Sequence, residues 1–311
     1  MADMKQRAMA RATVVRPQVI ALVTTRAAHG LDEDMAPLVA AFAAAGARTA
    51  VVDWDDAAVD WAAFDSVLLR SSWDYAERRD EFLAWAERVA ACTQLLNPLP
   101  VVRWSTDKHY LAQLAAQGVP TVPGEFVEPG LDAAAAVTAF LARHESREVV
   151  VKPAVGAGSR DAQRHAAAAL APIIAHVARL LAQGRSVLVQ PYLASVDEVG
   201  ETALVYIEGQ YDHAFRKGPL LRSGAGATGG LFAPEEITAR VPGADELDAG
   251  ARAVAAIPGG APLYARVDLI RDAAGAPRLL ELELAEPSLY FNYAPGSAQR
   301  FVTAVLARGA R

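Results

Sequence analysis

Two stretches near the C-terminal end of the chain alternate polar and apolar residues, as the paired strands of a β-hairpin do. They span residues 264–270 and 279–284, and the turn-rich segment 272–277 separates them. Because residues i and i+2 of a strand share a face, we expect Arg266 and Asp268 to face the same side. The opposite side of both stretches is apolar, which predicts that it packs into a hydrophobic core.

The second stretch brings two further carboxylates to this polar face. Glu281 and Glu283 can face the same side as Asp268 across the hairpin. Three converging carboxylates repel one another unless a cation lies among them. Oxygen ligands of this kind suit Mg²⁺, which shares its ligand shell with substrate phosphates. The alternative is an ordinary solvated hairpin face, and these two stretches alone do not decide between the two.

Upstream of the hairpin, apolar strands alternate with helical segments. The first lobe is expected to contain strands at 19–23, 48–52 and 66–69 and helices at 37–45 and 81–91. This alternation predicts a parallel sheet in an N-terminal α/β lobe. A middle lobe is expected from helices at 106–117 and 132–144, strands at 125–127 and 148–151, and a helix ending near 183. A C-terminal lobe is expected from strands at 186–190, 203–207 and 211–215, the hairpin, and a closing helix after Gly296. We set the three lobes at 17–104, 105–187 and 188–311.

The composition narrows the class of protein. The chain has 311 residues, 53% of them hydrophobic and 21% charged, as expected for a globular protein with more than one lobe. Its net charge of −6 argues against nucleic acid as a partner. The single cysteine cannot form an internal disulfide, and no apolar run approaches the roughly 20 residues that span a bilayer. We therefore expect a cytoplasmic protein that binds neither nucleic acid nor a membrane.

A lysine directly before a glycine-rich loop is the clearest candidate for an anion site. Lys152 ends an apolar strand, and Gly156 and Gly158 in the following loop let successive backbone N–H groups turn toward an anion. Ser159 adds a hydroxyl. The spacing matches neither the P-loop nor the dinucleotide fingerprint. Most glycine-rich loops are only turns, but the preceding lysine favours a phosphate site.

Two further lysines lie at the ends of predicted elements. Lys108 is near the start of a helix, and Lys217 ends a strand before the glycine-rich segment 223–230. Each of them alone is more often a surface charge. Together with Lys152, Arg266 and the three carboxylates, they suit a triphosphate with bridging metal ions.

From about Val19 to its C-terminus, the chain resembles the ATP-grasp superfamily. That resemblance implies an α/β fold with an N-terminal Rossmann-like lobe, a small middle lobe acting as a lid, and a C-terminal lobe, with ATP held between the last two. It implies that Lys108, Lys152 and Lys217 contact the phosphates of ATP. It also implies that the segment 223–230 is a lid.

The resemblance extends to the linker that recognises the nucleoside. Gln190, Tyr192 and Leu193 match the linker that reads the edge of adenine. A carboxylate that holds the ribose follows this linker in the family, and either Asp197, by spacing, or Glu201, by local pattern, matches it. The resemblance departs from the family at Gln190, where a glutamate is commoner.

The resemblance also assigns roles to the hairpin. Arg266 and Asp268 match the family's R-x-D pair, and Glu281 and Glu283 match its E-x-N pair. Arg266 and Lys217 would then stabilise the transferred phosphoryl group, and the three carboxylates would hold Mg²⁺. Glu283 replaces the usual asparagine, which leaves the number of Mg²⁺ ions open.

The N-terminal lobe offers a candidate substrate motif at 70–75, at the carboxyl end of a strand, where α/β sheets bind ligands. Arg70 could clamp a carboxylate and Asp74 an ammonium group, while Ser71 and Ser72 could bind polar atoms. The alternative is a helix cap at one of the serines, with the aromatic residues of the motif packing between lobes.

This motif resembles the subgroup of ATP-grasp ligases that cyclise O-ureido-D-serine in D-cycloserine biosynthesis. The resemblance implies an ATP- and Mg²⁺-dependent carboxylate–amine ligase that forms an acyl phosphate on a small amino-acid-like substrate. A small-molecule kinase on the same scaffold and a non-catalytic nucleotide-binding module remain as alternatives. A homodimer is expected only because homo-oligomers are common.

Overall fold

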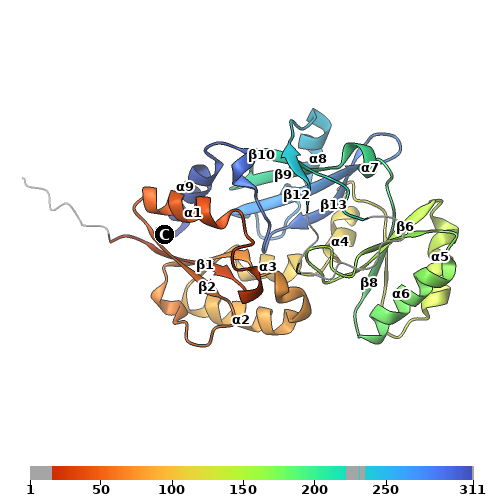
Figure 1. Cartoon of the computed structure of the whole chain (residues 1–311), viewed down its shortest axis with the longest axis horizontal. Helices are drawn as coiled ribbons and strands as arrows, with labels where there is room; N and C mark the ends of the chain where they lie inside the picture. The colour runs from red at the N-terminus through yellow and green to blue at the C-terminus, as the bar shows by residue number, and fades with distance from the viewer. Residues whose placement is uncertain (1–15, 222–230, 232–234, 310–311) are drawn as a thin grey trace, which may run out of the picture.

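The computed structural model describes residues 16–221, 231 and 235–309, so the proposed lid at 223–230 lies outside the described residues. The elements form three lobes, each built on its own sheet (Figure 1). The strands are β1 (Val19–Thr24), β2 (Arg48–Asp53), β3 (Ser66–Ser71), β4 (Gln94–Leu96), β5 (Glu125–Val127), β6 (Glu148–Pro153), β7 (Gln163–Ala166), β8 (Val187–Pro191), β9 (Glu201–Ile207), β10 (Gln210–Lys217), β11 (Ile237–Ala239), β12 (Tyr264–Arg271) and β13 (Pro277–Glu283). The α-helices are α1 (Met35–Ala44), α2 (Arg79–Cys92), α3 (Leu99–Ser105), α4 (Tyr110–Ala116), α5 (Ala133–Arg143), α6 (Leu170–Ala182), α7 (Val196–Val199), α8 (Ala244–Ala255) and α9 (Ser297–Gly309). Within the described ranges, no helix has the length and apolar character needed to cross a membrane.

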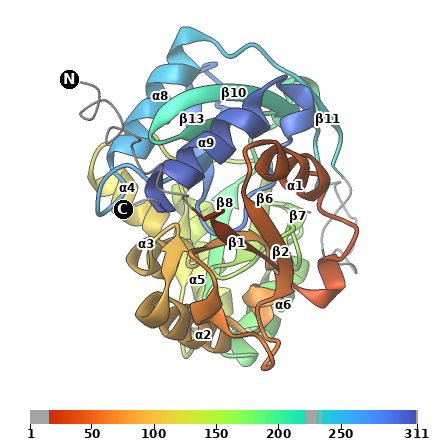
Figure 2. The same ribbon diagram turned by 90° about the vertical axis from the view of Figure 1, so that its left-hand side faces the viewer.

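The N-terminal lobe is a parallel sheet in the order β2-β1-β3-β4, as the alternation of strands and helices predicted. Successive residues of β1 enter different cores: Ile20 and Leu22 belong to one cluster, and Ala21 and Val23 to another. Helices α1 and α9 cover the first face, and α2 and α3 lie on the second (Figures 1 and 2). The last helix of the chain therefore completes the first lobe.

The C-terminal lobe is built on an antiparallel sheet in the order β11-β10-β9-β12-β13. The hairpin predicted from the alternating stretches is confirmed: Arg266 lies opposite Glu283, and Asp268 lies opposite Glu281. Between them on β12, Val267 belongs to the core that packs against α8. The apolar side of the hairpin thus fixes which side the charged residues face.

The middle lobe is a four-stranded antiparallel sheet in the order β5-β8-β6-β7, with α5 and α6 packed on one face. Because β8 continues to Pro191, the lobe boundary that we set between 187 and 188 falls inside a strand of this sheet. The single helix expected at 106–117 is also different. The structure has α3, a turn at 106–109, and then α4, and both helices contribute to the core around α8. The Asp107 carboxylate accepts the His109 N–H and so stabilises the turn.

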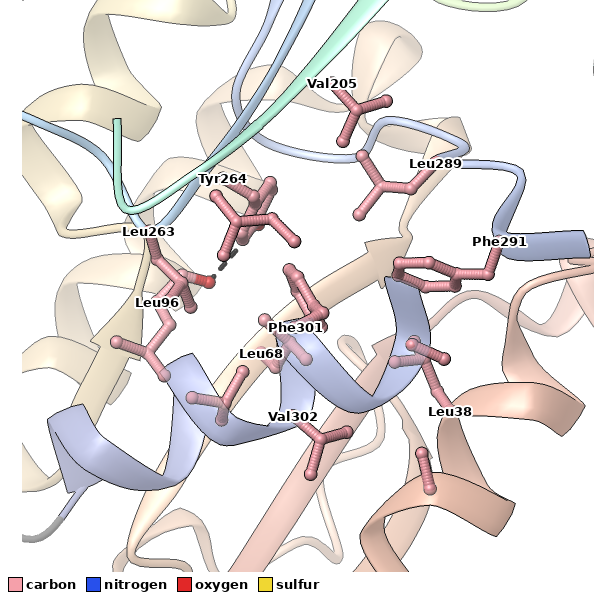
Figure 3. Close-up of a cluster of buried hydrophobic side chains, with 14 of the residues drawn as sticks. Leu38, Leu68, Leu96, Val205, Leu263, Tyr264, Leu289, Phe291, Phe301 and Val302 are labelled. Atoms are coloured by element: carbon pink, nitrogen blue, oxygen red, sulfur yellow. Dashed lines mark hydrogen bonds between the residues drawn. The ribbon is translucent and has the colours of Figure 1, made fainter. Parts of the chain in front are cut away.

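The first and last lobes share one core. Figure 3 shows Tyr264 of β12 beside Leu96 of the N-terminal lobe and Phe301 of α9. The Tyr264 hydroxyl lies 3.3 Å from each of the carbonyl oxygens of Leu69 and Leu96, and 3.0 Å from that of Ala285.

Asn97, which follows β4, ties the same two lobes together. Its side-chain amide donates to the carbonyl oxygens of Tyr264 and Leu284, both at 2.9 Å, and its side-chain oxygen accepts the Leu263 N–H at 2.7 Å. Since Asn97 is fully buried, these bonds satisfy polar groups that water does not reach. The N- and C-terminal lobes are therefore packed together through a shared core, and the middle lobe is attached beside them.

Candidate active site

A cavity of about 420 Å³ lies where the three lobes meet. Its wall brings together most of the residues proposed from the sequence. Those that line it are Lys108, Lys152, Gly156, Gly158, Ser159, Gln190, Tyr192, Leu193, Glu201, Lys217, Arg266, Glu281 and Glu283. They come from α4, β6, β8, β9, β10, β12 and β13 and the segments next to them. The sequence therefore predicted this part of the wall although its members lie far apart along the chain.

Lys217 lies at the centre of a group of carboxylates. Its ammonium group is 2.8 Å from Asp268, 3.1 Å from Glu201 and 3.6 Å from Glu235. Burial alone would lower the pKa of Lys217, but these three charges hold it well above its usual range. Lys217 is therefore a permanently charged group in the wall of the cavity.

Arg266 connects this group to the second strand of the hairpin. Its Nε and Nη2 each donate to a carboxylate oxygen of Asp268 at 2.8 Å, and Nη2 also donates to Glu283. Burial alone would raise the pKa of Asp268, yet Arg266 and Lys217 hold it well below its usual range. Asp268 is 1% exposed and lies behind the cavity wall. In this structure its direct partners are the two cations.

Lys108 joins the hairpin to the glycine-rich loop. Its ammonium group lies 2.8 Å from Glu281 and donates to the carbonyl oxygen of Gly156, also at 2.8 Å. Gly158 has a φ of 62°, in the left-handed region that favours glycine. The loop thereby folds back over the end of β6, where Lys152 lies.

Lys152 differs from the other cations of the wall. It is 9% exposed, and no carboxylate of the described part of the chain forms an ion pair with it. Burial lowers the pKa of Lys152 to about 8, because the charged form loses water without gaining a close counterion. A bound anion such as phosphate would supply that counterion.

The carboxylates of the hairpin are compatible with Mg²⁺ that arrives with phosphate. Glu281 and Glu283 line the cavity and offer oxygen ligands only, which Mg²⁺ prefers. Burial raises the pKa of Glu283 to about 8 despite the opposing charge of Arg266, so additional positive charge would stabilise its carboxylate form. Within the described residues, no three acidic, histidine or cysteine side chains form a ready-made metal cage. The donor set therefore fits an ion that keeps several ligands from water and phosphate.

The end of β8 and the residues after it contribute further polar groups to the cavity and its surroundings. Gln190 is 2% exposed and donates to the Val122 carbonyl oxygen at 3.4 Å, while its own side-chain oxygen has no partner in the described structure. The Tyr192 hydroxyl donates to Asp197 at 2.5 Å, and the Arg164 guanidinium lies 3.6 Å from the centre of the Tyr192 ring. Asp197 itself is outside the cavity wall, whereas Glu201 lies in the wall beside Lys217.

The structure places the polar residues of the N-terminal substrate motif outside the cavity wall. Arg70, Ser71, Ser72 and Asp74 do not line the cavity. Arg70 is 1% exposed, and its Nη2 donates to Asp34 at 3.1 Å, whereas its Nε and Nη1 have no hydrogen-bond partner within the described residues. Ser71 bonds to Thr24 at 2.8 Å, and Asp74 accepts the Trp54 indole N–H at 2.8 Å.

The aromatic residues of this motif do reach the cavity. Trp73 and Tyr75 line it from the 3₁₀ helix η3 (Trp73–Glu77); Ser72 precedes that helix, but its side chain makes no capping hydrogen bond. Trp73 donates its indole N–H to the Glu286 carbonyl oxygen at 3.1 Å. The aromatic residues thus contact the C-terminal lobe as the packing alternative predicted, whereas neither serine makes the capping bond of that alternative.

Sequence reasoning missed the loop at 286–291, which follows the hairpin and lines the same cavity. Asp34 accepts the backbone N–H groups of Leu289, Tyr290 and Phe291. Arg266 donates to the Ser288 carbonyl oxygen at 3.0 Å. Neither feature has a sequence signal, because Asp34 looks like an ordinary acidic residue before a helix and the loop has no periodicity.

Comparison with known proteins gives a consistent picture. Residues 20–97 match the family model for the N-terminal domain of D-cycloserine synthetase DcsG. The cycloserine biosynthesis protein DcsG of Streptomyces lavendulae is 46% identical over 299 residues, which cover 93% of this chain and 98% of that protein. The crystal structure of D-cycloserine synthetase DcsG aligns with a TM-score of 0.88 and 45% identity over 94% of this chain and 99% of that one. The ATP-grasp ligase PsnB, solved with a minimal precursor, aligns with a TM-score of 0.63 and 19% identity over 94% and 100% of the two chains.

Proposed function

The chain belongs to the D-cycloserine synthetase family, and from that premise we propose that it closes the ring of O-ureido-D-serine or a closely related amino-acid-like substrate. It is an ATP-dependent ligase of the ATP-grasp fold. The observation that carries the nucleotide site is Lys152, a buried cation with no ion-pair partner in the described structure, at the end of the cavity wall that also holds Lys108 and Lys217.

The proposed nucleotide contacts follow from the groups that lack partners. Lys152 would bind a phosphate, with the backbone of the glycine-rich loop beside it. The unpartnered side-chain oxygen of Gln190 would accept a hydrogen bond from the amino group of adenine. Either Asp197, which accepts the Tyr192 hydroxyl outside the cavity wall, or Glu201, which lies in the wall beside Lys217, would hold the ribose.

The proposed reaction has two steps. A carboxylate oxygen of the substrate attacks the γ-phosphorus, the bond from that phosphorus to ADP breaks, and an acyl phosphate forms. A nitrogen of the same substrate then attacks the acyl carbon, the C–N bond forms, phosphate leaves, and the nitrogen loses a proton. Arg266 and Lys217 would stabilise the negative charge in both steps from fixed positions.

Mg²⁺ fits the oxygen atoms of Glu281 and Glu283, and when bound it would neutralise the charge of the phosphates. Asp268 would act through its two cations, because its carboxylate orients Arg266 and Lys217. Glu281 and Glu283 now pair with Lys108 and Arg266. The number of Mg²⁺ ions that bind would depend on whether phosphate draws these cations away from the two carboxylates.

The Lys152 assignment predicts how ATP binding depends on pH. A bound phosphate raises the pKa of Lys152 above its value of about 8 in the free protein. The contribution of Lys152 to ATP affinity is therefore complete below pH 8 and is lost as the pH rises through the pKa of the bound state. We expect KM for ATP to rise up to about tenfold per pH unit above pH 8. In Lys152→Arg the charge persists, so the rise should disappear in steady-state kinetics. A flat profile in the wild type would contradict the assignment.

The metal assignment predicts the behaviour of Glu281→Gln. We expect kcat to fall about 100-fold, because one anionic ligand of Mg²⁺ is lost. The affinity for Mg²⁺, measured by calorimetry in the presence of ADP, should fall as well. Lys108→Met is the matched control, since it removes the other half of the 2.8 Å ion pair and leaves the carboxylate. Equal Mg²⁺ affinity in the wild type and Glu281→Gln would argue that Glu281 serves only Lys108.

The proposed function is tested by the products formed from Mg²⁺-ATP and O-ureido-D-serine. A ligase should release ADP and free phosphate in equal amounts, and mass spectrometry should detect a cyclised product that has lost water. A phosphorylated product without free phosphate would instead identify a kinase. Tight ADP binding without any turnover across amino-acid-like compounds would favour a nucleotide-binding module.

A further inference from the structure

Among the described residues of the cavity wall, one carboxylate is buried without an ion pair. Glu201, Glu235, Glu281 and Glu283 all pair with a lysine or with Arg266. Asp34 pairs with Arg70, and Glu33 is exposed. Glu286 is 7% exposed, and among the described residues no lysine, arginine or histidine forms an ion pair with it.

Two aromatic residues of the N-terminal lobe hold Glu286. Trp73 donates to its backbone carbonyl oxygen at 3.1 Å, and the Tyr75 hydroxyl bonds to its side chain. A hydroxyl can donate one hydrogen bond to a carboxylate, but it cannot neutralise the charge. The side chain of Glu286 is thus oriented. Lys108 and Arg266 act on it only from a distance, lowering its pKa, and no cation among the described residues forms an ion pair with it.

The loop that carries Glu286 is firmly attached to its surroundings. Asp34 binds three of its backbone N–H groups, and Arg266 binds the Ser288 carbonyl oxygen. His213 bonds to the Leu289 carbonyl oxygen at 2.7 Å. A carboxylate on such a loop has little freedom to turn toward water, so its position in the cavity wall is fixed before any ligand binds.

A buried carboxylate without a cation is unfavourable unless it is protonated or a ligand brings the missing charge. Burial accordingly raises the pKa of Glu286 to about 7. Arg266 would stabilise the reacting carboxylate of the substrate. It bonds to the carbonyl oxygen of Ser288, which is two residues after Glu286 in the same loop. An α-amino acid carries an ammonium group on the carbon next to its carboxylate. Its ammonium group could therefore face the negative charge of Glu286 while its carboxylate faces the positive charge of Arg266.

We propose that Glu286 binds the ammonium group of the substrate and thereby selects α-amino acids over compounds that lack the amine. This inference rests on the proposed function, because it names the group by which that same site recognises its substrate. It also reassigns the ammonium contact that the sequence suggested for Asp74. Asp74 lies outside the cavity wall and pairs with Arg78 at 3.7 Å in addition to bonding Trp54.

The test compares an amino-acid ligand with its des-amino partner. The two probes are O-ureido-D-serine and the same molecule with hydrogen in place of the amine. Binding of each to the full chain with Mg²⁺ and ADP is measured by calorimetry, so that no turnover is needed. We expect the wild type to bind the amine compound about 10- to 100-fold more tightly, the effect of one hydrogen bond between charged groups. Glu286→Gln should bind both compounds equally.

Three variants make the result specific. Glu33→Gln, which changes an exposed carboxylate that also lines the cavity, should keep the preference for the amine. Glu286→Asp keeps the charge and should also keep the preference, which guards against misfolding of Glu286→Gln. In steady-state assays, Glu286→Gln should raise KM for the amine substrate about 10-fold or more and change KM for ATP by less than about twofold. Preference retained in Glu286→Gln, or lost only in Asp74→Asn, would overturn the proposal.

Failure of the proposed function would look different. If the wild type releases no phosphate with O-ureido-D-serine, the same calorimetric comparison is made with D- and L-α-amino acids and their des-amino counterparts. A preference for the amine that Glu286→Gln removes would support the role of Glu286 with another substrate. No preference for the amine in any pair would overturn it.

Discussion

Replacing Arg266 by methionine is expected to lower kcat by at least about 1000-fold. In the proposed reaction the variant removes a donor directed at the reacting groups, and loss of one such preorganised donor costs about 10²- to 10³-fold in rate. It also leaves the buried carboxylate of Asp268 with Lys217 as its one remaining cation. Single-turnover measurement of ADP formation reads the chemical step directly, and ADP affinity by calorimetry shows whether the cavity persists.

Arg266→Lys separates charge from geometry. Lysine keeps the positive charge but cannot bond at the same time to Asp268, Glu283 and the Ser288 carbonyl oxygen, as the guanidinium does. We expect its kcat to remain at least about 100-fold below that of the wild type. Its free energy of unfolding should stay close to that of the wild type. Turnover within a few-fold of the wild type would mean that Arg266 contributes its charge alone.

Asp34→Asn is expected to destabilise the protein by about 3–5 kcal/mol, the usual effect of breaking a buried ion pair. Arg70, with its side chain fully buried, would keep only Asp32 at 3.8 Å. The side-chain NH₂ of the asparagine would also face backbone N–H groups that now donate to the Asp34 carboxylate, and two donors cannot bond to each other. Chemical denaturation reads the loss of stability, and KM for the amino-acid substrate should rise because the loop at 286–291 loses its attachment.

Glu33→Gln is the control for this prediction, since it removes a neighbouring carboxylate that is exposed. We expect its free energy of unfolding to stay within about 0.5 kcal/mol of the wild type, as for most surface substitutions. If Asp34→Asn unfolds like Glu33→Gln, the ion pair with Arg70 contributes little, and the loop must be held mainly by Arg266 and His213.

The hairpin was predictable because its information is local. A period of two along 264–270 and 279–284 fixes which residues share a face, and the turn between them fixes which strands pair. The structure accordingly pairs Asp268 with Glu281 and Arg266 with Glu283. The lysines were proposed from local family motifs, which can be read without knowledge of the fold, and the structure places all three in the cavity wall.

The N-terminal part of the site was not predictable in the same way. Arg70 reads as a free clamp in its own segment, and only the fold shows that Asp34 neutralises it. Glu286 follows the hairpin in a loop without periodicity, so nothing in its neighbours marks it as buried. The role of a charged side chain here depends on which residue from a distant part of the chain lies next to it. Such pairings follow from the tertiary structure alone.

Exchange of lobes between related enzymes is constrained by the junction at Tyr264 and Asn97. An N-terminal lobe transplanted through Asn97 would bring the donors of that side chain but would meet foreign carbonyl oxygens in place of those of Tyr264 and Leu284. It would also bring Asp34 without the loop whose N–H groups it binds. A chimera that changes substrate should therefore take the first lobe, the loop at 286–291 and α9 from the same parent enzyme. These segments come from both ends of the chain but pack together in the fold.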